Sequence, residues 1–312
     1  MVSALIGLCA VTGPALTTLL PWQQGRDEGE FTIAVDAEFV IFNVTVTDNK
    51  GRHVAGLRAS DFQVREENHL QDIKLFTAED GPASIGLIID NSGSMREKHA
   101  EVAQAALAFA MVSNREDEMF VVTFNERVSF GLPPSIPFTS DAEQIHSALV
   151  RTPPTGMTAL YDALAAGIEH LKTGIRDQKA LVVLSDGGDN ASHRRLNDVL
   201  QIARQSSATI YTIGIYDDAD MDRNPRVLRK IAETTGGQSY FPASLGALDR
   251  VWRDIAQGIR NQYVIGYHSS NPVHDGKFRK VSIVAKSGNR RDLRVTSRDG
   301  YLVPEEKEIK NN

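Results

Sequence analysis

Two kinds of hydrophobic pattern follow one another along the chain. Over residues 31–80, apolar and polar positions alternate, as they do in strands with one buried face. The segment "FVIFNVTVTDNKG" is the clearest case, and it ends in turn residues. One face carries Val40, Phe42, Val44 and Val46, and the other carries Phe39, Ile41, Asn43 and Thr45. "DFQVREENHLQDIKLF" predicts two more short strands around a polar turn. Together these strands would make half of a β-sandwich.

Between residues 82 and 260 the pattern changes to strands that alternate with helices. Four nearly continuous apolar runs are typical of parallel strands covered on both faces: "SIGLIID", "MFVVTF", "KALVVLSD" and "ATIYTIGI". Apolar residues at helical spacing predict buried helix faces at Val102, Ala106, Phe109, Val112; Leu160, Leu164, Ile168, Leu171; and Leu248, Val251, Trp252, Ile255, Ile259. This alternation predicts an α/β fold with a doubly wound, mostly parallel sheet.

After Asn261 the strand pattern returns in "QYVIGYH", "KVSIVAK" and "LRVTS". Two separate half-sheets would each leave an apolar face in water. We therefore expect residues 31–80 and 261–302 to pair as one small β-sandwich, with the α/β domain of residues 82–260 inserted between its halves. Residues 303–312 are predicted to form a disordered tail.

The first 24 residues differ from the rest of the chain. Residues 2–22 carry no charge, and their apolar centre has the length found in signal peptides. They lack a preceding basic segment, so an N-terminal membrane anchor and a buried or wrongly started segment stay open as alternatives. The single cysteine, Cys9, follows the bulky Leu8, where a lipoprotein cleavage site needs a small residue. We predict a signal peptide or anchor over residues 1–24, and a secreted, periplasmic or cell-envelope location.

Composition narrows the range of partners. The formal net charge is -6, and no cluster of Lys and Arg interrupts the chain. This argues against a nucleic-acid groove and against a patch for anionic membranes. Membrane contact is expected only through the N-terminal segment.

Oxygen-bearing side chains gather where segments of the predicted parallel sheet end. "GLIIDNSGSM" ends with Asp90, Ser92 and Ser94; Thr158 opens a helix, and Asp186 ends another buried strand. Ligands of open α/β sheets bind beyond the carboxyl ends of the strands. Two carboxylates and three hydroxyls suit a hard divalent cation, Mg²⁺ first, with Mn²⁺ or Ca²⁺ as alternatives. Each stretch alone is more typical of a helix cap or a turn than of a metal ligand, and only the shared position of all three favours a metal.

The same stretches resemble the metal-ion-dependent adhesion site of von Willebrand factor type A domains. "DNSGSM" has its Asp-x-Ser-x-Ser form, "TGMTALYDAL" resembles its threonine loop, "LVVLSDGGDN" its second acidic loop, and "LRKIAETTGGQSYF" the closing helix, turn and strand. The resemblance implies that the hydroxyls of Ser92, Ser94 and Thr158 contact the metal. It implies that Asp90 and Asp186 bind the metal directly or through water. One coordination position would stay open for a carboxylate of a partner protein.

The chain departs from the family pattern at one position, and its flanks add a second resemblance. Met157 stands where many relatives have a second glycine before the threonine, which removes no ligand. The flanks "VTVTDNKGRHVAGLRASDFQVREEN" and "QYVIGYHSSNPVHDGKFRKVSI" resemble the extensions of a bacterial, often acidobacterial, group of exported proteins with this domain.

Three functions follow as hypotheses. The first is a non-enzymatic, metal-dependent adhesion or interaction module that binds an Asp or Glu carboxylate of a protein partner. The second is a metal-dependent hydrolase, which lacks a recognisable general base or phosphate-binding loop near the ligands. The third is a structural scaffold with a vestigial metal site. A further acidic stretch, 217–224, begins like a calcium loop, but Arg223 replaces the required glycine and Arg229 the required Glu, which favours a solvated loop.

Overall fold

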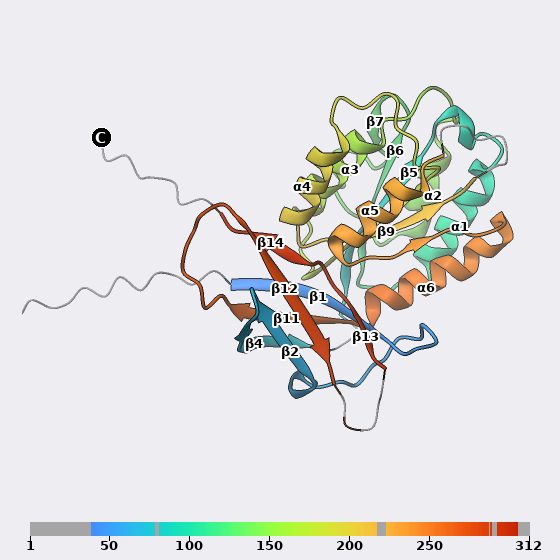
Figure 1. Cartoon of the computed structure of the whole chain (residues 1–312). Helices are drawn as coiled ribbons and strands as arrows, with labels where there is room; N and C mark the ends of the chain where they lie inside the picture. Colours follow the sequence, from blue (N-terminus) through green and yellow to red (C-terminus); the bar gives the residue numbers. More distant parts are fainter. Residues whose placement is uncertain (1–38, 79–80, 217–222, 287, 289–291, 305–312) are drawn as a thin grey trace, which may run out of the picture. The chain divides into compact units, whose positions relative to one another are not determined.

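The computed structural model describes residues 39–78, 81–216, 223–286, 288 and 292–304. These residues form one six-stranded sheet covered by helices and two four-stranded antiparallel sheets (Figure 1). The predicted signal segment, the acidic residues 217–222 and the predicted tail beyond residue 304 lie outside the described residues. Within the described ranges, no helix combines the length and apolar character needed to cross a membrane.

The central sheet has the strand order β10-β9-β8-β5-β6-β7. Its four predicted strands are β5 (Ala83–Asp90), β6 (Glu118–Phe124), β8 (Gln178–Ser185) and β9 (Thr209–Gly214). They pair in parallel, as does the short edge strand β10 (Ser239–Tyr240). Every residue of β5 is buried, which explains why its apolar run shows no alternation. The antiparallel edge strand β7 (Val128–Phe130) was not predicted.

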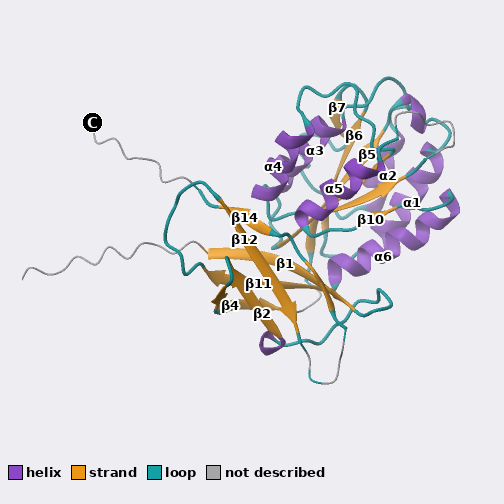
Figure 2. Ribbon diagram, in the orientation of Figure 1, coloured by secondary structure: helices purple, strands orange, loops and turns teal. Residues whose placement is uncertain are grey.

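Helices cover both faces of this sheet (Figure 2). On one face α1 (His99–Val112) contacts α2 (Ala142–Val150) and α6 (Leu248–Arg260). On the other, α3 (Leu160–Leu171) contacts α4 (Leu196–Gln205), which contacts α5 (Pro225–Thr235). The predicted apolar helix faces are buried in one core, with one exception. Val112 is 48% exposed because it is the last residue of α1, so its assignment to the core was wrong.

The two flanks of the α/β domain share the remaining sheets, as predicted. Strand β1 (Phe39–Thr47) pairs with β11 (Gln262–His268), and β2 (Phe62–Glu66) pairs with β12 (Phe278–Ala285). The two sheets have the orders β13-β1-β11-β4 and β14-β12-β2-β3 and enclose a single apolar core. Each sheet therefore combines strands from both flanks, which buries the apolar face that either flank alone would expose.

The segment "DFQVREENHLQDIKLF" forms three strands, β2, β3 and β4, one more than predicted. Glu67 and Asn68 both have positive φ, 46° and 70°, and make a tight turn into β3 (His69–Gln71). The chain then leaves this sheet at Asp72, and β4 (Ile73–Thr77) pairs with β11 in the other sheet. The sequence shows the polar turn but not this second break. Strands β13 (Arg294–Thr296) and β14 (Gly300–Leu302) complete the sandwich.

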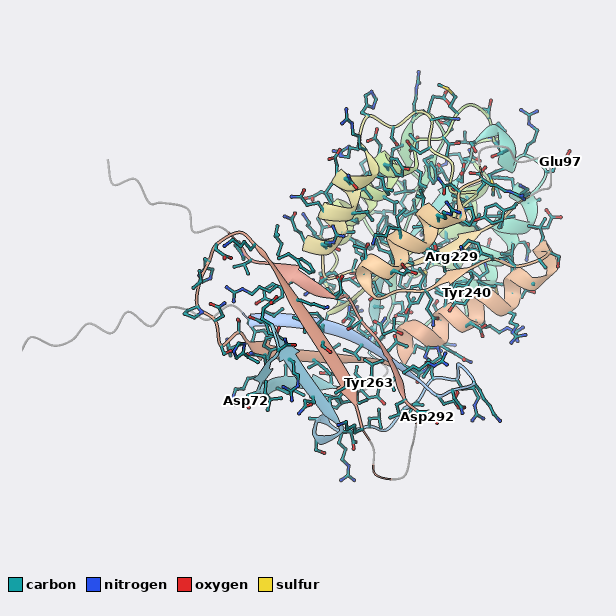
Figure 3. The ribbon with its side chains drawn as sticks, viewed as in Figure 1. Asp72, Glu97, Arg229, Tyr240, Tyr263 and Asp292 are labelled. Atoms are coloured by element: carbon teal, nitrogen blue, oxygen red, sulfur yellow. The ribbon has the colours of Figure 1, made fainter. Side chains whose placement is uncertain are left out.

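Several buried polar side chains of the sandwich form hydrogen bonds with one another or with the backbone. Tyr263, labelled in Figure 3, packs against aromatic rings of both sheets, and its hydroxyl donates to Val54 O at 2.7 Å. Glu66 is 2% exposed, and its carboxylate accepts hydrogen bonds from the hydroxyls of Tyr267 and Tyr301. Arg279 completes this network with an ion pair to Glu66 at 3.1 Å. These contacts fix how β2, β11, β12 and β14 pack together.

The sandwich contacts the α/β domain at the amino end of β9. Gln262, the first residue of β11, donates hydrogen bonds from Nε2 to the Tyr211 hydroxyl at 3.0 Å and to Thr209 Oγ1 at 3.3 Å. Asn43 Nδ2 donates to Ser207 O at 3.0 Å. The carboxyl ends of the parallel strands, where the oxygen-rich stretches lie, are at the opposite edge of the sheet.

Candidate metal site

The two acidic stretches meet because their strands are neighbours. Strands β5 and β8 are parallel, with Ile89 opposite Leu184, so Asp90 lies beside Ser185 and one residue before Asp186 in the register. The Ser185 hydroxyl donates a hydrogen bond to Asp90 Oδ2 at 2.6 Å. The second carboxylate oxygen, Oδ1, accepts the backbone N–H of Ser92 at 2.9 Å. Both oxygens of Asp90 are thus held in fixed directions.

The turn after β5 brings both predicted serines to Asp186. A 3₁₀ turn, η2 (Gly93–Met95), follows Ser92 and places its Oγ 3.1 Å from the Oγ of Ser94. The Ser94 hydroxyl donates to Asp186 Oδ2 at 2.8 Å. Four of the five predicted residues, Asp90, Ser92, Ser94 and Asp186, therefore lie in one connected group at the sheet edge.

The threonine loop packs against the same group. Gly93 N donates to Gly156 O at 3.1 Å, and Thr155 N donates to Asn91 O at 3.0 Å. Thr158 is 6% exposed, and its backbone N–H donates to Asn190 Oδ1 at 2.8 Å. In return, Thr158 O accepts the backbone N–H of Asn190 at 2.9 Å. The loop that carries Thr158 is therefore tied both to the serine turn and to the loop after Asp186.

Sequence reasoning missed the residues that hold this third loop. Helix α3 has Ala159 at its N-cap, which offers no side-chain cap. The loop after β8 supplies the cap instead: Asp189 Oδ1 accepts the N–H of Tyr161 at 3.2 Å, and the Ser192 hydroxyl accepts the N–H of Asp162 at 3.1 Å. Ser192 also donates to Asp189 at 2.6 Å. The only signal in the sequence was the density of capping residues in "DGGDNAS".

A reciprocal set of contacts completes this clamp. Asp162, in the first turn of α3, accepts hydrogen bonds from the backbone N–H groups of His193 at 2.9 Å and Arg194 at 3.2 Å. These hydrogen bonds lower the pKa of the Asp162 carboxyl below its usual value, against the effect of its burial. The N-terminus of α3 and residues 189–194 therefore hold each other, and Thr158 lies at their junction.

The two buried carboxylates of this group would be stabilised by a nearby positive charge. Asp90 is completely buried and Asp186 is 3% exposed, and neither forms an ion pair with a basic side chain of the described residues. Burial raises the pKa of Asp90 to about 6; hydrogen bonds from Ser185 and Ser92 oppose the rise, and the charge of Asp186 adds to it. Two buried carboxylates without a positive partner are unfavourable, so a bound divalent ion would stabilise this arrangement.

The donor set fits a hard ion. Among the described residues, no group of three or more His, Cys, Asp or Glu side chains lies close enough together to hold a metal. A metal at the sheet edge would thus need the hydroxyls of Ser92, Ser94 and Thr158 besides the two carboxylates. Such all-oxygen sets, completed by water, are typical of Mg²⁺, Mn²⁺ and Ca²⁺.

Comparison with known proteins identifies the family and supports the fold. The family model of the von Willebrand factor type A domain matches residues 84–252. The chain belongs to the VWA domain family. A solved von Willebrand factor type A protein from Catenulispora acidiphila aligns over 87% of this chain and 75% of its own, with 18% identity and a TM-score of 0.53. This likeness supports the fold, flanking sheets included.

Two further solved structures are similar to part of this chain. The type V pili tip protein Mfa5 from Porphyromonas gingivalis aligns over 58% of this chain and 95% of its domain, at 14% identity and a TM-score of 0.47. Proximal thread matrix protein 1 from the mussel byssus, with a zinc-occupied adhesion motif, aligns over 62% of this chain and 49% of its own, at 18% identity and a TM-score of 0.48. No curated protein matches the chain.

Proposed function

We propose that this VWA protein is a metal-dependent protein-binding module. In the proposal, Ser92, Ser94 and Thr158 hold a divalent ion through their hydroxyls, and Asp90 and Asp186 hold it directly or through water. The single observation that carries the proposal is the connected group at the sheet edge, where two buried carboxylates lie among hydroxyls and have no basic partner among the described residues. The bound ion would supply an open position that attracts an outside carboxylate.

The residues of the chain prepare this position in a specific way. Ser185 and the backbone of Ser92 fix the Asp90 carboxylate, while Ser94 and the backbone N–H of Gly188 fix that of Asp186, at 2.8 and 2.9 Å. Two aspartates that both bind a divalent ion directly would nearly neutralise its charge. If one of them acts through water, and hydrogen bonds keep its carboxylate from turning toward the ion, that charge is only partly neutralised. The metal then keeps positive charge for an Asp or Glu side chain of a protein partner. Mg²⁺ is the first candidate, and Mn²⁺ and Ca²⁺ are the alternatives.

The proposed location is outside the cytoplasm, in the cell envelope or beyond. It rests on the uncharged apolar segment at residues 2–22, which has the character of a signal peptide or anchor. No partner is expected from nucleic acids, because the chain is acidic, with a formal net charge of -6.

The test is a Mg²⁺ titration of the purified protein, followed by thermal unfolding and calorimetry. Wild type should be stabilised by Mg²⁺ and return to its initial melting temperature in EDTA. Asp186→Ala should fold but lose the response, and Asp249→Asn, which alters an exposed carboxylate on α6, should keep it. An identical melting temperature with Mg²⁺, Mn²⁺, Ca²⁺ and EDTA would contradict the proposal and favour a vestigial site.

The hydrolase alternative has its own discriminating assay. Turnover of p-nitrophenyl phosphate with Mg²⁺ or Mn²⁺, abolished by Asp90→Ala, would favour metal-activated hydrolysis. The binding module should show no such turnover above the Asp90→Ala background.

A further inference from the structure

An exposed apolar side chain lies next to the candidate metal site. Met157 directly precedes Thr158 in the threonine loop, and its side chain is 53% exposed. Methionine is flexible and polarizable, and it is over-used at surfaces that bind other proteins. At this position it extends the metal site with an adaptable apolar contact.

A fixed carboxylate lies beside the same methionine. Glu126, in the turn between β6 and β7, accepts the backbone N–H of Met157 on Oε2 at 3.2 Å. The same turn is also tied to the threonine loop by the N–H of Ala159, which donates to Asn125 O at 2.7 Å. Glu126 is exposed and forms no ion pair within the described residues, so its charge is available to a partner.

The loop is shaped to admit this carboxylate. Gly156 has φ +82°, and a Cβ built at this position would overlap the Glu126 carboxylate. Any side chain at position 156 would therefore displace Glu126 or the loop. Gly156 O also accepts the N–H of Gly93, which lies between Ser92 and Ser94. Gly156 therefore lies next to both the Glu126 carboxylate and the turn that carries the proposed ligands Ser92 and Ser94.

We propose that Met157 and Glu126 form a second contact zone that selects the partner of the metal site. The matching partner segment carries, beside the carboxylate that binds the metal, one apolar side chain and one Lys or Arg. The proposal rests on the proposed function, because it needs the ion to capture the carboxylate.

Charge complementarity gives the reason for the basic residue. A divalent ion and two aspartates together carry no net charge, so a bound partner carboxylate leaves the site negative. Glu126 adds a second negative charge next to it. A purely acidic partner segment is then repelled, while a neighbouring Lys or Arg pairs with Glu126 and relieves the repulsion. The exposed Arg127, next in the chain, carries the opposite charge and would favour acidic segments if it dominated.

The experiment is selection from a phage-displayed random nonapeptide library on immobilised full-length protein in Mg²⁺, with elution by EDTA. Peptides enriched on wild type should contain Asp or Glu together with Lys or Arg and an apolar residue. A synthetic version of one enriched peptide should lose affinity about 1.5- to fivefold on Glu126→Lys, the range of an exposed ion pair. Met157→Gly should also weaken peptide binding, because it removes the contact with the apolar residue of the peptide but leaves the charge of Glu126 unchanged. Glu116→Lys, the same charge change at the other end of β6, is the control and should leave binding unchanged.

The possible outcomes separate the two proposals. If the protein shows no Mg²⁺ response, the proposed function fails and the contact zone fails with it. If Mg²⁺ binds but no EDTA-released peptide is enriched, or the enriched peptides show no preference for Lys or Arg, the contact zone is wrong while the metal site stands. Enrichment of acidic residues only would mean that Arg127, rather than Glu126, determines which peptide charge is preferred. That result would also overturn the inference.

Discussion

The Ser94 hydroxyl donates a hydrogen bond to Oδ2 of Asp186 at 2.8 Å, although 92 positions separate the two residues in the chain. The contact joins the turn after β5 to the end of β8. Both residues are among the proposed metal ligands, so this hydrogen bond holds two of them together.

Ser94→Ala should weaken Mg²⁺ binding on the order of tenfold or more, as expected for the loss of one donor from a small site. Ser94 is exposed, so the free energy of unfolding without metal should change by less than about 1 kcal/mol. Calorimetric titration gives the affinity, and the exposed Ser135→Ala serves as a control. Equal Mg²⁺ affinity in Ser94→Ala and wild type would remove Ser94 from the donor set.

Thr158 can be tested by comparing two substitutions. Thr158→Val keeps the shape of the buried side chain but removes its hydroxyl, and should lower Mg²⁺ affinity by a factor on the order of ten or more. Thr158→Ser keeps the hydroxyl and should bind Mg²⁺ nearly as well as wild type. Similar affinities for the two variants would show that the hydroxyl makes no contact with the ion.

Asp90→Asn should stabilise the metal-free protein. The carboxyl is fully buried, and burial raises its pKa from 3.8 to about 6. Its ionised form therefore costs on the order of 3 kcal/mol above pH 6, and nothing below pH 3.8, where both folded and unfolded chains are protonated. Asparagine keeps the size of the side chain without the charge.

The measurement for Asp90→Asn is urea unfolding in EDTA between pH 4 and pH 7. The unfolding free energy of wild type should fall relative to that of the variant as pH rises through this window. In saturating Mg²⁺ at pH 7 the order should reverse, because only wild type gains stability from the ion. A variant less stable than wild type in EDTA at pH 7 would contradict the argument.

Asp189→Ala should act on Thr158 without touching the metal. It removes an acceptor for the N–H groups at the start of α3, which should cost about 1–2 kcal/mol of stability. Because the same loop holds Thr158 through Asn190, Mg²⁺ affinity should also decrease, by less than in Thr158→Val. Asp189→Asn retains an acceptor oxygen and should restore most of both quantities. Loss of stability without any change in Mg²⁺ affinity would show that Asp189 caps α3 but does not support the position of Thr158.

Glu66→Ala should destabilise the sandwich and leave the metal site intact. The substitution leaves Arg279 buried without its ion pair and two tyrosine hydroxyls without their acceptor, which should cost about 3–5 kcal/mol. Chemical unfolding measures this loss, and Mg²⁺ titration of the folded variant should give wild-type affinity. A parallel loss of Mg²⁺ affinity would mean that the sandwich supports the sheet edge through β9.

The hydrophobic pattern was enough to predict an element where its burial follows a regular period along the chain. The central strands were predicted because both of their faces are buried, and the paired flanks because each has one apolar face. Strand β7 was missed, since its three residues are partly exposed and only pairing with Val122–Phe124 defines it. The break at Asp72 was missed because a change of sheet leaves no periodic signal.

The sequence by itself determined which side chains the proposed metal site would use: two carboxylates and three hydroxyls, each placed next to an element boundary by a local motif. Only the tertiary structure decided that Ser94 meets Asp186, that Asp189 caps a helix beginning 29 positions earlier in the chain, and that Glu126 lies against Gly156. The physical reason is that periodicity and turn chemistry depend on neighbours in the chain. Contacts between distant loops depend on strand order and on the close fit of backbones, which no local pattern encodes.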